Sequence, residues 1–157
     1  MLLLAPNGQV HTAKLHVTPV FAIGFAMAVC GTIIRWKCYR TLGHRFTFRL
    51  TIRKDHELCT EGPYSIVRHP SYAAAFLYSI GHNLCHLGTG SWWMECGVWS
   101  TTAGKVIGCL LLMWHVVIVP AVLKRCKVED EVLKQVFGEQ WIEWSKKTPY
   151  AVLPYVY

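Results

Sequence analysis

The chain has 157 residues, enough for one domain, of which 53% are hydrophobic and only 16% charged. A typical soluble domain carries about 25% charged residues, so this composition argues against a soluble globular protein. The net charge of +7 comes from basic residues gathered in two blocks beside apolar segments. That distribution predicts a membrane topology, and no nucleic-acid partner is expected.

Three stretches contain no Asp, Glu, Lys or Arg: residues 15–34, 70–94 and 106–123. Each is close to the ~20 residues that a helix needs to cross the hydrocarbon core of a bilayer. Helices of a soluble bundle normally show polar faces, and these segments show few. We therefore predict an all-α integral membrane protein with about three transmembrane helices, over residues 15–36, 70–90 and 105–123.

Residues 37–69 form the predicted loop between the first two membrane helices. Residues 45–53 partly alternate apolar and polar side chains, a pattern that predicts an extended stretch. Gly62 and Pro63 predict a turn. Pro70 suits the first position of the next helix, where its missing N–H costs nothing.

The second and third membrane helices contain three histidines. His82 and His86 are four residues apart, a spacing that places both on one helix face and could bind a metal. No carboxylate lies near them in the sequence, so hydrogen bonding inside the helix bundle is the favoured interpretation and no metal site is predicted. His115 is expected to donate a hydrogen bond between helices.

The tail, residues 124–157, is predicted to contain an amphipathic helix interrupted at Gly138, with Val128, Val132 and Val136 four residues apart. Fourteen of the sixteen basic residues lie in this tail, at the end of the first membrane helix or between the first two membrane helices. The positive-inside rule then places loop and tail in the cytosol. The whole chain, residues 1–157, is predicted to form a single membrane domain with lipid headgroups as partners.

Polar side chains gather where the loop and the tail meet the membrane. The second and third helices have a short connection and should pack as neighbours, so these two regions can face each other. Together they offer Tyr64, Arg68, His69, Tyr72, Arg125, Glu129, Asp130 and Glu131. The first N–H groups of the second helix would attract anions. This set suits a zwitterionic, aromatic ligand; alternatively, Arg68 and His69 only mark the helix end at the headgroups.

The motifs in this region form a recognisable order. A G-x-Y turn (Gly62–Tyr64) is followed by R-H-P-x-Y at a helix start (Arg68–Tyr72), and the tail carries R-x-x-x-E (Arg125 with Glu129) and then Phe137-Gly138. In order and spacing the chain resembles the isoprenylcysteine carboxyl methyltransferase family of integral membrane enzymes. The resemblance covers roughly residues 42–154. Family members often carry further N-terminal membrane helices, whereas one helix precedes the shared core here.

The resemblance implies methyl transfer from S-adenosylmethionine to the C-terminal carboxylate of a prenylated cysteine in a protein or peptide. It also implies a multi-pass protein of the endoplasmic reticulum membrane with its active site facing the cytosol. Arg125 falls on the position that meets the substrate carboxylate. Cofactor contacts fall on His56, Glu57, Leu58, Cys59, Tyr64, His69, Pro70, Ser71, Tyr72 and Glu129, and on Thr51 across a gap.

Two other functions fit the same pattern. A phospholipid amine N-methyltransferase has a comparable turn and cofactor site, but it would not need Arg125 to hold a carboxylate. A catalytically silent membrane scaffold would retain only the fold. For Arg125 and Glu129 themselves, the structural alternative is a simple i,i+4 surface pair, worth about 0.3–0.5 kcal/mol.

Overall fold

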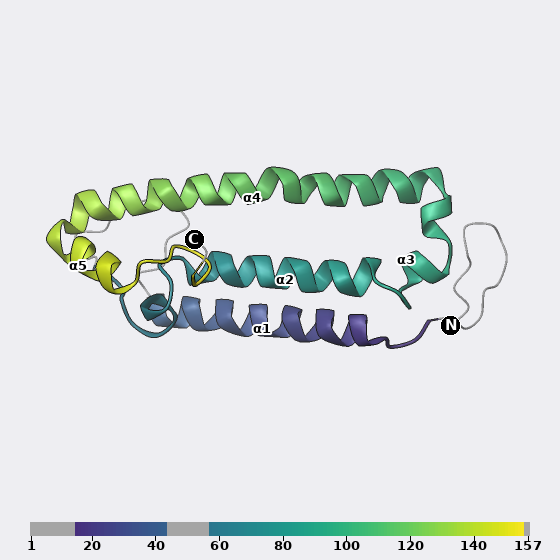
Figure 1. Ribbon diagram of the computed structural model, residues 1–157, viewed down its shortest axis with the longest axis horizontal. Helices are drawn as coiled ribbons and strands as arrows, with labels where there is room; N and C mark the ends of the chain where they lie inside the picture. Colours follow the sequence, from purple (N-terminus) through teal and green to yellow (C-terminus); the bar gives the residue numbers. More distant parts are fainter. Residues whose placement is uncertain (1–14, 44–56, 156–157) are drawn as a thin grey trace. The chain divides into compact units, whose positions relative to one another are not determined.

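The computed structural model describes residues 15–43 and 57–155 (Figure 1). The predicted extended stretch at 45–53 lies outside these residues. In chain order the elements are α1 (Pro19–Leu42), the 3-10 turn η2 (Gly62–Ser65), α2 (Pro70–Leu87), α3 (Trp92–Glu95), η3 (Val98–Ser100), α4 (Thr102–Phe137) and α5 (Glu139–Lys147). No strand occurs among the described residues, so the all-α prediction is confirmed for them.

Two of these helices, α1 with 24 residues and α4 with 36, are long and apolar enough to cross a bilayer. Few residues of their most apolar stretches are buried inside the protein, which leaves the apolar side chains where lipid would cover them. α2 has only 18 residues and includes the polar residues His82, Asn83 and His86. The third membrane crossing therefore remains a prediction.

The ends of α1 and α4 differ from those predicted. α1 continues past residue 36 to Leu42, where Gly43 follows with a φ of +51°. α4 continues past residue 123 to Phe137, because residues 121–137 contain neither Gly nor Pro to end it. The third membrane helix and the first part of the tail helix are thus one continuous helix. The interruption predicted at Gly138, whose φ is +51°, is confirmed.

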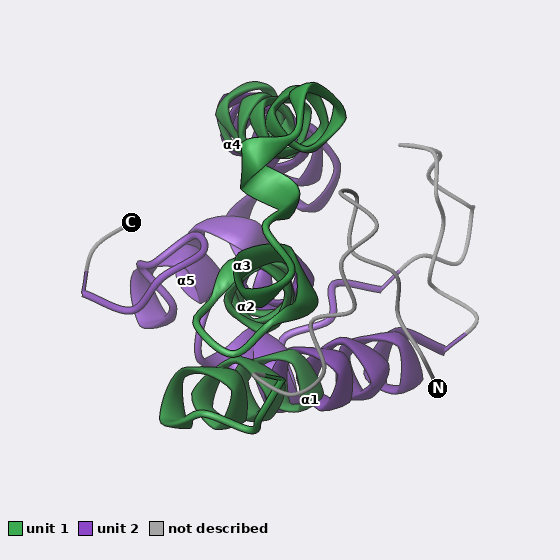
Figure 2. Ribbon diagram, turned by 90° about the vertical axis from the view of Figure 1, so that its right-hand side faces the viewer, with its two compact units in different colours: residues 1–30, 77–119 green, residues 31–76, 120–157 purple. Residues whose placement is uncertain are grey.

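The described residues group into two compact units, coloured separately in Figure 2. The first unit contains residues 15–30 and 77–119, and the second contains residues 31–43, 57–76 and 120–155. α1, α2 and α4 each contribute one part to both units.

In the first unit, α1 and α2 meet at two glycines. A Cβ added at Gly81 would overlap the carbonyl oxygen of Gly24 and would lie 2.6 Å from the backbone N of Ala28. A Cβ at Gly24 would lie 2.8 Å from the carbonyl oxygen of Gly81. Small residues at such a crossing let two backbones approach closely, which is a common way for membrane helices to pack.

Replacing Gly81 by Val should therefore destabilise the protein. The added side chain meets backbone atoms that have no rotamer to change, and overpacking of this kind costs about 1–3 kcal/mol. Thermal unfolding in detergent should show a lower midpoint. Ile80→Val is the matched control, since Ile80 is exposed and the same side chain is introduced on the same helix. An unchanged midpoint for Gly81→Val would contradict the close packing.

His115 on α4 contacts α2 within the same unit. Its Nε2 lies 2.5 Å from Ser79 Oγ and 3.1 Å from Asn83 Nδ2, and its Nδ1 lies 2.7 Å from the carbonyl oxygen of Leu111. Because Nδ1 faces a carbonyl, it carries the proton, and Nε2 accepts from Ser79 and Asn83. The predicted interhelical hydrogen bond is present, with His115 as its acceptor instead of its donor.

Candidate active site

The start of α2 is built from a turn and a proline. Gly62 has a φ of +58°, a conformation that favours glycine, and begins the η2 turn. α2 begins at Pro70, as predicted, and His69 precedes it. The N–H groups of Tyr72 and Ala73 donate to the carbonyl of His69 over 3.1 and 3.3 Å. Pro70 has no N–H, and the N–H groups of Tyr72 and Ala73 are already hydrogen-bonded to His69. The helix start therefore offers fewer free N–H donors to an anion than the sequence predicts.

A C-terminal segment, Thr148–Val152, lies against this helix start. The backbone N–H of Arg68 donates to the carbonyl of Tyr150 over 2.9 Å, and that of His69 donates to the carbonyl of Ala151 over 2.7 Å. Val152 is almost fully buried, in a cluster with Cys126 of α4. The C-terminal segment thus connects the start of α2 to α4 within the second unit.

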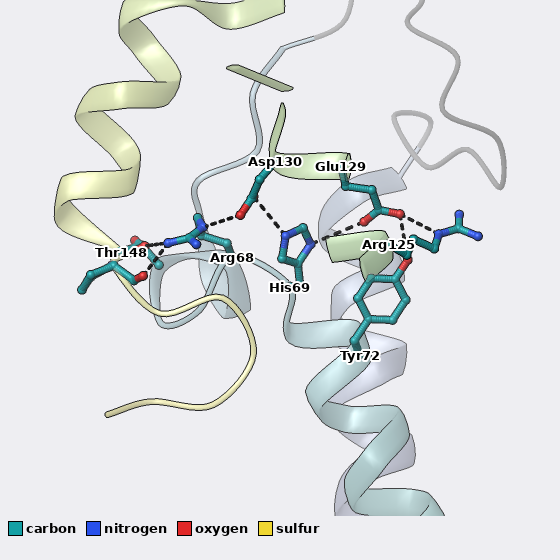
Figure 3. A network of polar contacts seen from close by, with 8 residues as sticks. Arg68, His69, Tyr72, Arg125, Glu129, Asp130 and Thr148 are labelled. Carbon is teal, nitrogen blue, oxygen red and sulfur yellow. Dashed lines mark hydrogen bonds and ion pairs between the residues drawn. The ribbon is translucent and has the colours of Figure 1, made fainter. Parts of the chain in front are cut away.

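Glu129 on α4 receives three side chains. Its Oε1 accepts from the Tyr72 hydroxyl over 2.7 Å and from Nε of Arg125 over 2.8 Å. Its Oε2 lies 3.4 Å from Nδ1 of His69. Figure 3 shows the carboxylate between these three groups. The sequence prediction that the α2 start and the tail face each other is confirmed by these contacts.

Asp130 extends the same network to the C-terminal segment (Figure 3). Its Oδ1 lies 3.0 Å from Nε2 of His69, and its Oδ2 accepts from Nε of Arg68 over 3.1 Å. Nη1 of Arg68 also donates to the carbonyls of Thr148 and Pro149, over 3.1 and 2.5 Å. The Arg68 side chain therefore connects Asp130 to the C-terminal segment.

His69 is only 6% exposed and lies between two carboxylates. Burial lowers the pKa of His69, but its hydrogen bonds to Asp130 and Glu129 raise it by more, so the pKa lies above the ordinary value. The charged imidazolium is thus stabilised by the folded protein. Burial also raises the pKa of Tyr64, which stays a neutral phenol at physiological pH.

A second cluster lies beside this network and contains Cys38, Tyr64 and Trp144. The indole N–H of Trp144 donates to the carbonyl of Tyr64 over 3.2 Å. Leu58 and Trp141 pack against the cluster. The Trp141 indole nitrogen is buried and has no hydrogen-bond partner among the described residues. A buried donor without a partner is unusual in proteins, so this atom marks a place where an acceptor could bind.

The structure places the predicted site residues in several different surroundings. The network brings together His69, Tyr72, Arg125 and Glu129. The neighbouring cluster contains Tyr64, with Leu58 and Cys59 packed against it. Pro70 and Ser71 are the first two residues of α2. Glu57 is exposed. Thr51 and His56 lie outside the described residues. Glu131, which we expected in the pocket, is exposed and takes no part in the network of Figure 3.

A model of the isoprenylcysteine carboxyl methyltransferase (ICMT) family matches residues 22–135 of the chain. The chain belongs to this family. The matched range contains the start of α2 and the Arg125–Asp130 segment, so the side chains of the network around His69 and Glu129 lie in the part shared with the family. The family match ends before Trp141 and the C-terminal segment.

Individual family members are similar over most of the chain. It is 33% identical over 135 residues to protein-S-isoprenylcysteine O-methyltransferase B of Arabidopsis thaliana, covering 85% of this chain and 58% of that protein. It is 29% identical over 143 residues to the protein-S-isoprenylcysteine O-methyltransferase of Xenopus laevis, covering 90% of this chain and 43% of that protein. The chain therefore spans about half the length of these relatives.

Proposed function

We propose that the protein transfers a methyl group from S-adenosylmethionine to the C-terminal carboxylate of a prenylated cysteine in a protein or peptide. One observation carries this proposal: the two motifs that carry the family resemblance meet at a single carboxylate. The Tyr72 hydroxyl of the first motif donates to Glu129 of the second, 57 residues further along the chain. The names of the two relatives supply the substrate class.

The residues present fit S-adenosylmethionine chemically. A carboxylate has about four acceptor sites, and Glu129 receives three donors, of which His69 at 3.4 Å is distant for a hydrogen bond. Glu129 can therefore also accept from the ammonium or ribose hydroxyls of the cofactor. The buried indole N–H of Trp141 suits a nitrogen or carboxylate acceptor of the same molecule. Tyr64 and Tyr72 supply aromatic walls.

When bound, S-adenosylmethionine supplies an electrophilic methyl group on a sulfonium. The substrate carboxylate is already ionised at neutral pH, so the protein needs no general base. Its residues must instead orient the carboxylate and exclude water. Arg125, whose side chain is 50% exposed, can reach an incoming carboxylate while Glu129 holds its Nε. A guanidinium pairs with a carboxylate through two parallel hydrogen bonds, which fixes the orientation of the nucleophile.

The same proposal includes the membrane arrangement. α2 is inferred to be a third crossing, beside α1 and α4, and the network is inferred to face the cytosol because the flanking segments carry most of the basic residues. A prenyl group partitions into the bilayer, so a site at the membrane surface meets the cysteine carboxylate where it emerges. The endoplasmic reticulum is the location expected for such an enzyme.

The proposed reaction is tested by labelled methyl transfer in membranes that contain the protein. N-acetyl-S-farnesylcysteine and phosphatidylethanolamine are offered as acceptors in parallel. We expect label on the farnesylcysteine, released by alkali because the product is a methyl ester. Label on phosphatidylethanolamine alone would favour an amine methyltransferase, and label on neither acceptor, with no S-adenosylhomocysteine binding, would favour a silent scaffold.

The role of Trp141 is tested by replacing it with Phe, which removes the N–H and retains an aromatic ring. One net hydrogen bond is worth about 1 kcal/mol, so S-adenosylhomocysteine should bind roughly fivefold more weakly by calorimetry. Trp93→Phe is the matched control, because the Trp93 indole nitrogen is also buried without a described partner but belongs to the first unit. Equal affinity of the Trp141 variant and the wild type would remove Trp141 from the site.

A further inference from the structure

Asp130 contacts two consecutive residues of the α2 start with its two oxygens. Oδ1 lies 3.0 Å from Nε2 of His69, and Oδ2 accepts from Nε of Arg68 over 3.1 Å. Its side chain is 15% exposed, as is that of Arg68, so both partners are partly removed from water. These contacts fix the ring of His69 from the side opposite to Glu129 (Figure 3).

The second partner of Asp130, Arg68, connects it to the C-terminal segment. Its Nη1 donates to the carbonyls of Thr148 and Pro149, and its backbone N–H donates to Tyr150. Removing the Asp130 carboxylate would release both the ring of His69 and the guanidinium that holds this segment. Removing the Asp130 carboxylate would therefore change the contact between His69 and Glu129, although Asp130 itself need not contact a ligand.

We propose that Asp130 is a positioning residue: it sets the orientation of His69, which faces Glu129, and holds the C-terminal segment against the start of α2 through Arg68. This proposal rests on the proposed function in one respect, namely that Glu129 belongs to the methyl-donor site. The family resemblance assigns no role to Asp130, and the geometry of the network alone points to it.

Several charged or titratable groups surround His69. Tyr72, Glu129 and Asp130 contact its ring, and Arg68, Arg125 and Cys126 lie beside those two carboxylates. After the opposing effect of burial, the hydrogen bond to Asp130 contributes most to the pKa of His69 and raises it. Losing the charge of Asp130 should therefore lower the pKa of His69.

Two substitutions at Asp130 distinguish its role in positioning His69 and Arg68 from the effect of its negative charge. In Asp130→Asn, the amide oxygen can still accept from Arg68, and the amide NH2 can donate to Nε2 of His69. The imidazole would then be neutral, with its proton on Nδ1 facing Glu129. Asp130→Ala removes both contacts. Glu131→Gln is the matched control, because it neutralises an exposed carboxylate one residue further on.

The test uses the full chain in detergent and has two readouts. The first is the titration midpoint of His69 by nuclear magnetic resonance, assigned with a His69→Gln variant. It should fall in Asp130→Asn and stay unchanged in Glu131→Gln. The second is S-adenosylhomocysteine affinity by calorimetry at a fixed pH. We expect Asp130→Ala to bind at least about tenfold more weakly and Asp130→Asn to lie within about threefold of wild type.

Two results would overturn the proposal. One is an unchanged His69 midpoint in Asp130→Asn, and the other is wild-type affinity in a folded Asp130→Ala. A lower unfolding temperature with unchanged affinity would show a purely structural role and would also overturn it. If Asp130→Ala does not fold, the near-normal affinity expected for Asp130→Asn, with its lowered His69 midpoint, decides the question. If the wild type itself binds no S-adenosylhomocysteine, the proposed function fails, and the His69 midpoint still tests the positioning.

Discussion

Glu129→Gln should weaken the binding of S-adenosylhomocysteine by roughly 30-fold or more. The carboxylate accepts from Tyr72 and Arg125 and is paired with His69. A glutamine amide presents an NH2 group to at least one of these donors, so the loss exceeds that of a single neutral hydrogen bond. Hydrogen bonds to charged groups are worth about 1.5–3 kcal/mol, and 1.4 kcal/mol corresponds to tenfold in affinity.

Calorimetry of the purified protein measures this effect, with Glu131→Gln as the control of equal charge change. The control residue is exposed, two positions away on the same helix. If Glu129→Gln binds as tightly as the control, Glu129 does not belong to the donor site, and its contacts with the α2 start are structural only.

Arg125→Ala should reduce methyl transfer to a farnesylcysteine analogue by about 100-fold while changing the affinity for S-adenosylhomocysteine by less than about threefold. The guanidinium is expected to contribute up to about 3 kcal/mol through a charge-assisted pair with the acceptor. Its contact with the proposed donor site is indirect, through Glu129. The effect should therefore appear in the KM for the acceptor and in kcat.

Two further variants sharpen this result. Arg125→Lys retains the charge but not the planar fork, so it should recover only part of the activity. Lys124→Ala removes the adjacent exposed cation and should leave methyl transfer unchanged. Normal methylation by Arg125→Ala would show that the residue is a surface partner of Glu129 and that the acceptor carboxylate is held elsewhere.

Much of the candidate site could be predicted because its residues follow simple spacing rules. Arg125 and Glu129 are four apart, so a helix brings them together at 2.8 Å, and the short connection between α2 and α4 places the two motifs on one side. Pro70 and Gly138 have restricted or special backbone conformations, and both mark helix ends where expected.

The contacts of the C-terminal segment were not predicted, because backbone groups make them. Arg68 and His69 donate to the backbone carbonyls of Thr148–Ala151, and any residue type can supply a carbonyl. The continuous course of α4 was also missed, because the change from apolar to charged residues near Lys124 marks a change of environment and not a helix end. The indole N–H of Trp141 could be identified as a candidate donor only from its burial in the structure.

We propose that the α2 start and the Arg125–Asp130 segment together bind the methyl donor. Ultraviolet cross-linking of radiolabelled S-adenosylmethionine to the protein in membranes, followed by peptide mapping, tests this claim most directly. We predict label in peptides that contain Gly62–Tyr72 and Arg125–Asp130, abolished by excess S-adenosylhomocysteine. Label confined to residues 77–119, or label that excess S-adenosylhomocysteine does not displace, would contradict the account.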